Sequence, residues 1–188
     1  MPMTQIDDIN GYRATLGARA KAAARQLGLA SSAEKDAALR AAAKAFRQNA
    51  ATLLAANAQD LAAEQGAGKT DVFLDRLTLT PDRIAAMADA IAAQCWHRCG
   101  ALCLKSGNAL ILRGGSESLN STRVIVACLR QGLHASGLPS DCVQMVQTPD
   151  RHAVLQLLRA VETVDLAIPH ARRGLVGLAQ REARVPSS

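Results

Sequence analysis

The chain has 188 residues, a formal net charge of +6, and 49% hydrophobic residues but only 2% aromatic ones. This length fits one domain with a core, or a helical domain and part of a second one. The charge favours anionic ligands, but the chain lacks the basic tracts and interleaved aromatic residues of a nucleic-acid surface. No apolar run reaches the roughly 20 residues of a membrane span, and the N-terminus lacks a signal-peptide layout. We therefore predict a cytoplasmic, helix-rich protein with neither a nucleic-acid nor a membrane partner.

The first half of the chain, residues 1–98, is predicted to be mainly helical because its apolar residues recur at helical spacing. A capping box begins at Ser31, whose hydroxyl caps a backbone donor while the Glu34 carboxylate reaches back. Asn49 is placed to cap the next helix, and Thr80-Pro81 combines a favoured N-cap with proline in the first turn. The predicted helices cover residues 6–29, the capping box to Gln48, 50–65, 69–77 and a segment that starts at Pro81.

Beyond residue 99, short apolar runs alternate with helical segments. Gly107-Asn108 is suited to end a helix in the left-handed conformation, and the apolar run Ala109–Leu112 is then a buried strand. Successive strand and helix units predict a parallel sheet with crossover helices over residues 99–188. The predicted elements are strand 109–112, helix 117–136, strand 143–146, helix 151–160, strand 164–168 and helix 173–182.

The turn after the first of these strands is the best candidate for a ligand site. Gly114-Gly115 lets the backbone approach a ligand closely, and Ser116 is placed to cap the helix that follows. A phosphate at this place would meet free backbone N–H groups and the positive end of the helix. The pattern therefore predicts an anionic cofactor without identifying it.

The cysteines and acidic residues give no sign of a metal or acid–base site. The thiols are predicted to be reduced, and they are Cys95, Cys99, Cys103, Cys128 and Cys142. The first three form an i, i+4, i+8 stripe and lack the paired Cys-x-x-Cys knuckles of a structural zinc site. We interpret Asp60, Asp75 and Asp82 as caps and surface charges rather than as a catalytic pair. No metal site is predicted, and no catalytic residue is assigned.

A set of motifs stands in a fixed order along the chain. They are Ala55-Ala-Asn-Ala-Gln-Asp60, Leu74 to Ile84, Leu102 to Gly115, Gly137-Leu-Pro139 and Val164 to Pro169. In this order they resemble the γ-glutamyl phosphate reductase family, also called glutamate-5-semialdehyde dehydrogenases. The resemblance implies the α/β fold of the aldehyde dehydrogenase superfamily, with an N-terminal helical region followed by an incomplete Rossmann-like parallel sheet. It also implies NADPH-dependent reduction of γ-glutamyl phosphate to glutamate 5-semialdehyde in proline biosynthesis.

The resemblance further assigns three candidate cofactor-binding residues. In this fold the residue at the end of the strand at 109–112 faces the adenosine ribose, which puts Arg113 beside the 2′-phosphate of NADPH. Ser116 and Glu117 occupy the following turn, where they are placed to contact the phosphate or the ribose. Capping the helix is an equally good role for Ser116.

The chain departs from the family in three places. Pro169-His-Ala-Arg-Arg-Gly174 lacks the Arg-Gly-Gly that usually follows this proline, which crowds a turn that must approach the pyrophosphate closely. The segment from Cys95 to Gly100 stands where the family carries a few dozen further residues, including an Arg-Pro-Asn whose Asn helps to hold the oxyanion. The family would continue beyond Ser188 into the nucleophile domain, which is absent here, and none of the cysteines matches its nucleophile. We therefore expect no turnover by this chain alone.

Two hypotheses follow from the match and its departures. In the first, the chain is the N-terminal and partial cofactor-binding portion of a γ-glutamyl phosphate reductase. In the second, it is a non-catalytic remnant that binds a nucleotide or associates with itself, because strands missing from a parallel sheet leave unpaired edges. A neighbouring reading frame that encodes the nucleophile domain would favour the first.

Overall fold

The computed structural model of the protein describes residues 8–93, 100–148, 151–168 and 181–186. The chain forms two compact units, residues 1–22 with 146–188 (unit 1) and residues 23–145 (unit 2). The predicted boundary between residues 98 and 99 lies outside the described residues. The helices are α1 (Ile9–Leu29), α2 (Ser32–Gln48), α3 (Ala50–Gly66), α4 (Asp71–Leu77), α5 (Pro81–Ala92), α6 (Gly100–Lys105), α7 (Leu119–Ala135) and α8 (Arg151–Leu158).

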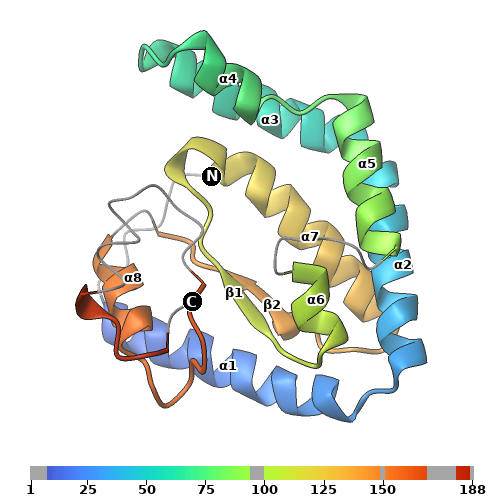
Figure 1. The fold of residues 1–188 in the computed structure, drawn as a ribbon, viewed down its shortest axis with the longest axis vertical. Helices are drawn as coiled ribbons and strands as arrows, with labels where there is room; N and C mark the ends of the chain where they lie inside the picture. Colours follow the sequence, from blue (N-terminus) through green and yellow to red (C-terminus); the bar gives the residue numbers. More distant parts are fainter. Residues whose placement is uncertain (1–7, 94–99, 149–150, 169–180, 187–188) are drawn as a thin grey trace. The chain divides into compact units, whose positions relative to one another are not determined.

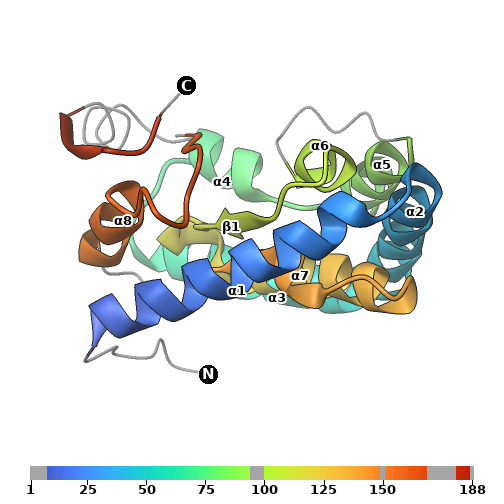
Figure 2. The same ribbon diagram turned by 90° about the horizontal axis from the view of Figure 1, so that it is seen from below.

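Helices α2 and α7 form the centre of unit 2. Helix α7 packs against α2 and α3, and α2 also packs against α5 (Figures 1 and 2). Both central helices are amphipathic, and their apolar stripes meet in a core that includes Leu39, Phe46, Leu129 and Leu133, each at most 1% exposed. Because α2 is rich in alanine, the two helix backbones approach closely where Gly132 faces it.

A two-stranded parallel sheet lies in unit 2 and confirms the predicted strand–helix–strand unit. Strand β1 (Leu110–Leu112) pairs with β2 (Val143–Met145), with Leu110 opposite Val143 and Leu112 opposite Met145. Helix α7 is the crossover between them, as Figure 1 shows. All three residues of β2 are buried, the polar Gln144 included. Among the described residues, the fold is therefore mostly helical with a small parallel sheet, as the sequence predicts.

Local capping signals are largely confirmed. The Ser31 hydroxyl accepts a hydrogen bond from Glu34 N at 3.2 Å, while Ser31 N donates to Glu34 Oε2 at 2.7 Å, which completes the capping box. Thr80 caps α5 through Arg83 N, and Gly107 has φ = 85° at the end of α6. The prediction for Asn49 is wrong in detail. Its side chain makes no cap bond to α3, because its Nδ2 donates backwards to the Ala45 carbonyl of α2.

In unit 1, helix α8 is confirmed, but the predicted strand 164–168 is wrong. The structure describes no strand there, only a single bridge at Ala167, whose N–H donates to the Pro186 carbonyl at 2.9 Å. Leu166 and Ile168 are 52% and 41% exposed, so the apolar run that suggested a buried strand is not covered by described residues. Most of the predicted helix 173–182 lies outside the described residues.

Candidate functional site

The candidate site is the loop Arg113–Ser118, which joins the carboxyl end of β1 to α7. Ligands of parallel α/β sheets bind at the carboxyl ends of the strands. Arg113 directly follows the last residue of β1, and its side chain is exposed. Its guanidinium makes no hydrogen bond or ion pair with any residue that the structure describes. At this edge of the sheet, the loop therefore exposes to solvent a cationic side chain that has no described partner.

Ser116 and Glu117 lie in the same loop, but Ser116 does not cap α7. The chain first makes a 3₁₀ turn, η1 (Ser116–Ser118), and the α-helix begins only at Leu119. The Ser116 hydroxyl instead donates to Glu117 Oε2 at 3.4 Å. The predicted cap is wrong because the 3₁₀ turn carries Ser116 away from the first N–H groups of the helix.

The two glycines of the loop lie against side chains of the protein itself. A Cβ at Gly115 would stand 2.4 Å from Glu117 Oε2, so the Glu117 carboxylate folds back over this residue. A Cβ at Gly114 would stand 3.0 Å from Thr122 Oγ1, in the early part of α7. The glycines thus permit close packing of the loop onto the start of α7, in addition to any approach of a ligand.

The N-terminus of α7 is occupied by a buried carboxylate, that of Asp60, for which the sequence predicts a cap or a surface charge. Asp60 of α3 is only 3% exposed. Its Oδ1 accepts from the backbone N and the Nδ2 of Asn120 at 3.1 and 2.9 Å, and its Oδ2 accepts from the N and Oγ of Ser121 at 2.9 and 2.6 Å. Asp60 is therefore a cap, as predicted, but not a surface charge. Two of the N–H groups at the start of α7, those of Asn120 and Ser121, are therefore bound by Asp60 and not free for a phosphate.

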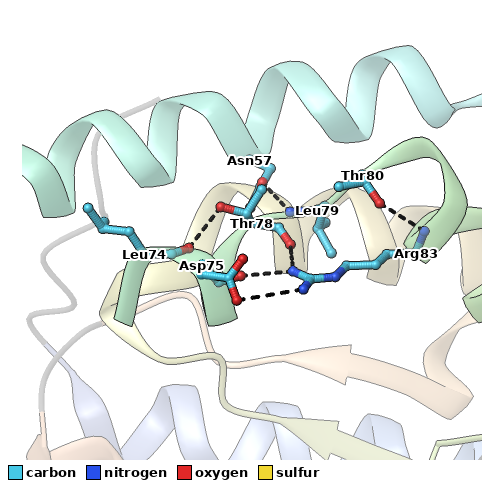
Figure 3. A network of polar contacts seen from close by, with 7 residues as sticks. All are labelled: Asn57, Leu74, Asp75, Thr78, Leu79, Thr80 and Arg83. Carbon is cyan, nitrogen blue, oxygen red and sulfur yellow. Dashed lines mark hydrogen bonds and ion pairs between the residues drawn. The ribbon is translucent and has the colours of Figure 1, made fainter. Parts of the chain in front are cut away.

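Asn57 joins the same network one turn earlier on α3 and holds the linker between α4 and α5. Its Oδ1 accepts from Leu79 N at 2.7 Å, and its Nδ2 donates to the Leu77 carbonyl at 3.0 Å and to Ser121 Oγ at 3.3 Å. Figure 3 shows Asn57 facing this linker, with Arg83 reaching back to the carbonyls of Asp75 and Thr78.

A sequence signal for these two residues exists in the periodicity of α3. Its buried positions are Leu53, Ala56, Asn57 and Asp60, which follow the i, i+3, i+4, i+7 pattern of one helix face. Polar residues on such a face are buried, and buried polar groups require partners. The pattern indicates that Asn57 and Asp60 have partners, but it does not tell which ones.

Two of the described thiols, Cys128 and Cys142, are poorly suited to act as nucleophiles. Cys128 and Cys142 are 2% and 0% exposed. Burial raises the pKa of the Cys128 thiol, and burial together with the nearby Asp141 carboxylate raises that of Cys142 to about 11. Cys103 is partly buried on α6, while Cys95 and Cys99 lie outside the described residues. Among the described residues, no cluster of three or more potential metal-ligating side chains is found.

The raised pKa of Cys142 predicts a loss of stability at high pH. Between the ordinary thiol pKa and about 11, the unfolded chain releases this proton while the folded chain keeps it. The free energy of unfolding should therefore fall as the pH rises through this window, by about 2 kcal/mol at pH ~11. Urea denaturation at a series of pH values measures the fall. Cys142→Ala should lack this contribution, and an identical pH profile in both proteins would contradict the prediction.

Two sequence features of the candidate site cannot be placed. The segment Pro169 to Gly174 and the short segment 95–99 lie outside the described residues. None of the described helices combines the length and the apolar character needed to cross a bilayer.

Comparisons with known proteins identify relatives over most of the chain. A γ-glutamyl phosphate reductase of Rhodospirillum rubrum is 42% identical over an alignment that covers 96% of this chain and 52% of the relative. The crystal structure of γ-glutamyl phosphate reductase from Thermotoga maritima matches with a TM-score of 0.88 and 25% identity, covering 93% of this chain and 52% of that one. No protein-family model matches the chain.

More distant structures share the fold alone. An acetylating aldehyde dehydrogenase from Geobacillus thermoglucosidasius matches with a TM-score of 0.69 and 16% identity, over 97% of this chain and 47% of that one. An engineered glycolyl-CoA reductase with bound NADP⁺ matches with a TM-score of 0.65 and 15% identity, over 93% and 45% of the two chains.

The chain spans about half the length of the curated relatives that it matches. The alignment with the Rhodospirillum protein extends over 221 residues, more than the 188 of this chain, so the relative carries additional residues inside the matched region. This agrees with the internal shortening that the sequence predicts. The sequence identity and the structural match together support one conclusion. The chain belongs to the γ-glutamyl phosphate reductase family, and its described residues have the aldehyde dehydrogenase fold.

Proposed function

We propose that this chain carries the adenosine-binding part of the NADPH site of a γ-glutamyl phosphate reductase. The observation that supports it best is the exposed Arg113 guanidinium, which has no described partner and stands at the carboxyl end of β1. Arginine matches a phosphate monoester through two parallel charge-assisted hydrogen bonds, so Arg113 would hold the 2′-phosphate that distinguishes NADPH from NADH.

In this proposal, Ser116 and Glu117 complete the site with a hydroxyl group and a carboxylate. The Ser116 hydroxyl is exposed, and its 3.4 Å contact with Glu117 is long enough to be exchanged for a ligand. Glu117 is an acceptor suited to the hydroxyl groups of a ribose. Both residues follow Arg113 within a few positions, as a single nucleoside phosphate requires.

In the whole reductase, we propose that bound NADPH supplies the hydride that reduces γ-glutamyl phosphate to glutamate 5-semialdehyde. This chain's own contribution is to bind and orient the adenosine end of the cofactor through the loop Arg113–Ser118. The reaction also needs a thiolate and donors for the oxyanion. Cys128 and Cys142 are buried thiols with raised pKa, so neither is suited to the first role.

Titration of the 188-residue polypeptide with NADPH tests the proposal. NADPH fluorescence should change in a saturable way, and NADH should bind more weakly because it lacks the 2′-phosphate. The same polypeptide should show no reduction of NADP⁺ above the protein-free rate when glutamate 5-semialdehyde and phosphate are added. Absence of NADPH binding, or equal affinity for NADH, would contradict the assigned site, and measurable turnover would contradict the assignment of no catalytic residue. Cytoplasmic location, self-association and the lack of a nucleic-acid partner stay predictions from the sequence.

A further inference from the structure

We propose that Asp60 is a positioning residue for the cofactor loop: its buried carboxylate fixes the first turn of α7 and thereby holds Arg113, Ser116 and Glu117 in a binding arrangement. The inference rests on the proposed function for the use of the loop. Its structural part rests on the contacts of Asp60 and on the packing of the loop against α7. Asp60 belongs to the motif Ala55 to Asp60, which the proposed cofactor site does not otherwise use.

Helix α7 lacks a side-chain cap of its own. Ser118 occupies the N-cap position, but its side chain makes no cap hydrogen bond. The first N–H groups of a helix need acceptors, and a carboxylate is favoured at the positive end of the helix dipole. Asp60 supplies this acceptor from a different helix, at a sequence separation of 60 residues from Asn120. The start of α7 is therefore fixed by a tertiary contact.

The loop Arg113–Ser118 packs directly on the turn of α7 that Asp60 holds. Gly114 lies so close to Thr122 that a Cβ there would stand 3.0 Å from the hydroxyl oxygen. Thr122 immediately follows Ser121, whose N–H and hydroxyl both bind Asp60. The other end of the loop is anchored by the pairing of β1 with β2. A shift of the first turn of α7 must therefore move the loop, since its other end is fixed.

Asp60 is itself held in place by a buried hydrogen-bond network. Ser121 Oγ, which donates to Asp60, also accepts from Asn57 Nδ2, and Asn57 is tied to the linker between α4 and α5. Asn57 is only 2% exposed. A buried network in which each polar group has a partner specifies one arrangement more strongly than separate bonds would. This rigidity is what a positioning role requires.

The decisive variant is Asp60→Asn. The amide oxygen can still accept from Asn120, but the amide NH₂ would face the N–H and hydroxyl donors of Ser121 and cannot accept from them. We expect NADPH affinity to fall on the order of tenfold. Hydrogen exchange, followed by mass spectrometry without ligand, should become at least about tenfold faster over residues 113–122.

The matched control is Ser31→Ala, which removes a helix cap from α2 whose side-chain hydrogen bonds run to Glu34. It lowers stability by a comparable cap contribution but should leave NADPH affinity and the exchange of residues 113–122 within about twofold of the unmodified chain. If Asp60→Asn does not fold, Ser121→Ala replaces it, because this change removes one donor to Asp60 and keeps the backbone bond.

The outcomes separate this inference from the proposed function. Unchanged NADPH affinity in Asp60→Asn, or an equal loss in Ser31→Ala, would overturn the positioning role. If the unmodified chain bound no NADPH, the proposed function would fall, and the exchange data would still decide the role of Asp60 in holding the loop. Faster exchange of residues 113–122 only in Asp60→Asn would then support that role, and equal exchange in both variants would overturn it.

Discussion

Replacing Gly132 by alanine is expected to lower the free energy of unfolding by about 3 kcal/mol or more. Gly132 lies on α7 at its closest approach to α2. A Cβ at this position would stand 2.5 Å from both the Ala38 carbonyl oxygen and the Ala42 nitrogen, and 2.6 Å from the Ala42 Cβ. Two of these atoms belong to the backbone, so no side chain can rotate away, and the helices must separate.

A second alanine substitution provides the control, because its surroundings are open. Gly28 lies within α1, and a Cβ there would meet no atom within 4 Å. Gly28→Ala should raise the stability by about 0.5 kcal/mol, since alanine loses less backbone freedom than glycine on entering a helix. Urea denaturation followed by far-UV circular dichroism measures both variants. A Gly132→Ala protein within ~1 kcal/mol of the unmodified chain would show that the helix contact is looser than described.

The parts of the fold that the sequence predicts correctly are those decided by near neighbours. The capping box at Ser31 involves residues three positions apart, and Thr80-Pro81 starts α5 for equally local reasons. The left-handed residue Gly107 ends α6 because glycine adopts that conformation without strain. In each case the interactions that select the conformation lie within one turn of the chain. Residue types and their spacing are therefore enough to predict it.

The errors arise where a distant residue competes with a near one. Ser116 was a reasonable cap for α7 by its position, but Asp60 provides the cap from another helix. Asn49 illustrates the same competition at short range, since its amide can bind either the helix before it or the helix after it. The run at 164–168 has residues that are typical of a strand. A strand also needs a neighbouring strand to pair with, and the local sequence pattern does not show whether one is present.

The candidate site, too, is predictable only where near neighbours in the sequence decide its structure. Its location after β1 is predictable, because a short apolar strand followed by glycines and a helix is a local pattern. The groups that would hold its anion are not predictable from the local sequence. The helix N-terminus that a local argument offers to a phosphate is already capped by Asp60, which leaves the exposed Arg113 as the cation of the loop for which the structure describes no partner. In the proposed site, the positive charge that attracts the phosphate therefore comes from the Arg113 side chain rather than from the N-terminus of α7.

Charge reversal of that side chain is expected to have the largest effect on ligand binding. Arg113→Glu should weaken NADPH binding about a hundredfold, because it removes a charge-assisted pair and places a carboxylate beside the 2′-phosphate. NADH has no phosphate at this position, so its affinity should change by less than about threefold. Fluorescence titration with both cofactors measures the difference directly.

A matched charge reversal separates the local contact from the general field of the protein. Arg40 is an exposed arginine on α2, and Arg40→Glu changes the net charge by the same amount. Arg40 lies between Ala38 and Ala42, which contact Gly132 near the end of α7, whereas the loop precedes the start of α7. Because charges more than roughly 10 Å apart are largely screened at moderate salt, Arg40→Glu should alter NADPH affinity by less than about twofold. An equal loss of NADPH and NADH affinity in Arg113→Glu would indicate damage to the loop rather than loss of a phosphate contact. Selective loss of NADPH affinity is the result that the assigned role of Arg113 requires, because only that cofactor carries the group it is proposed to bind.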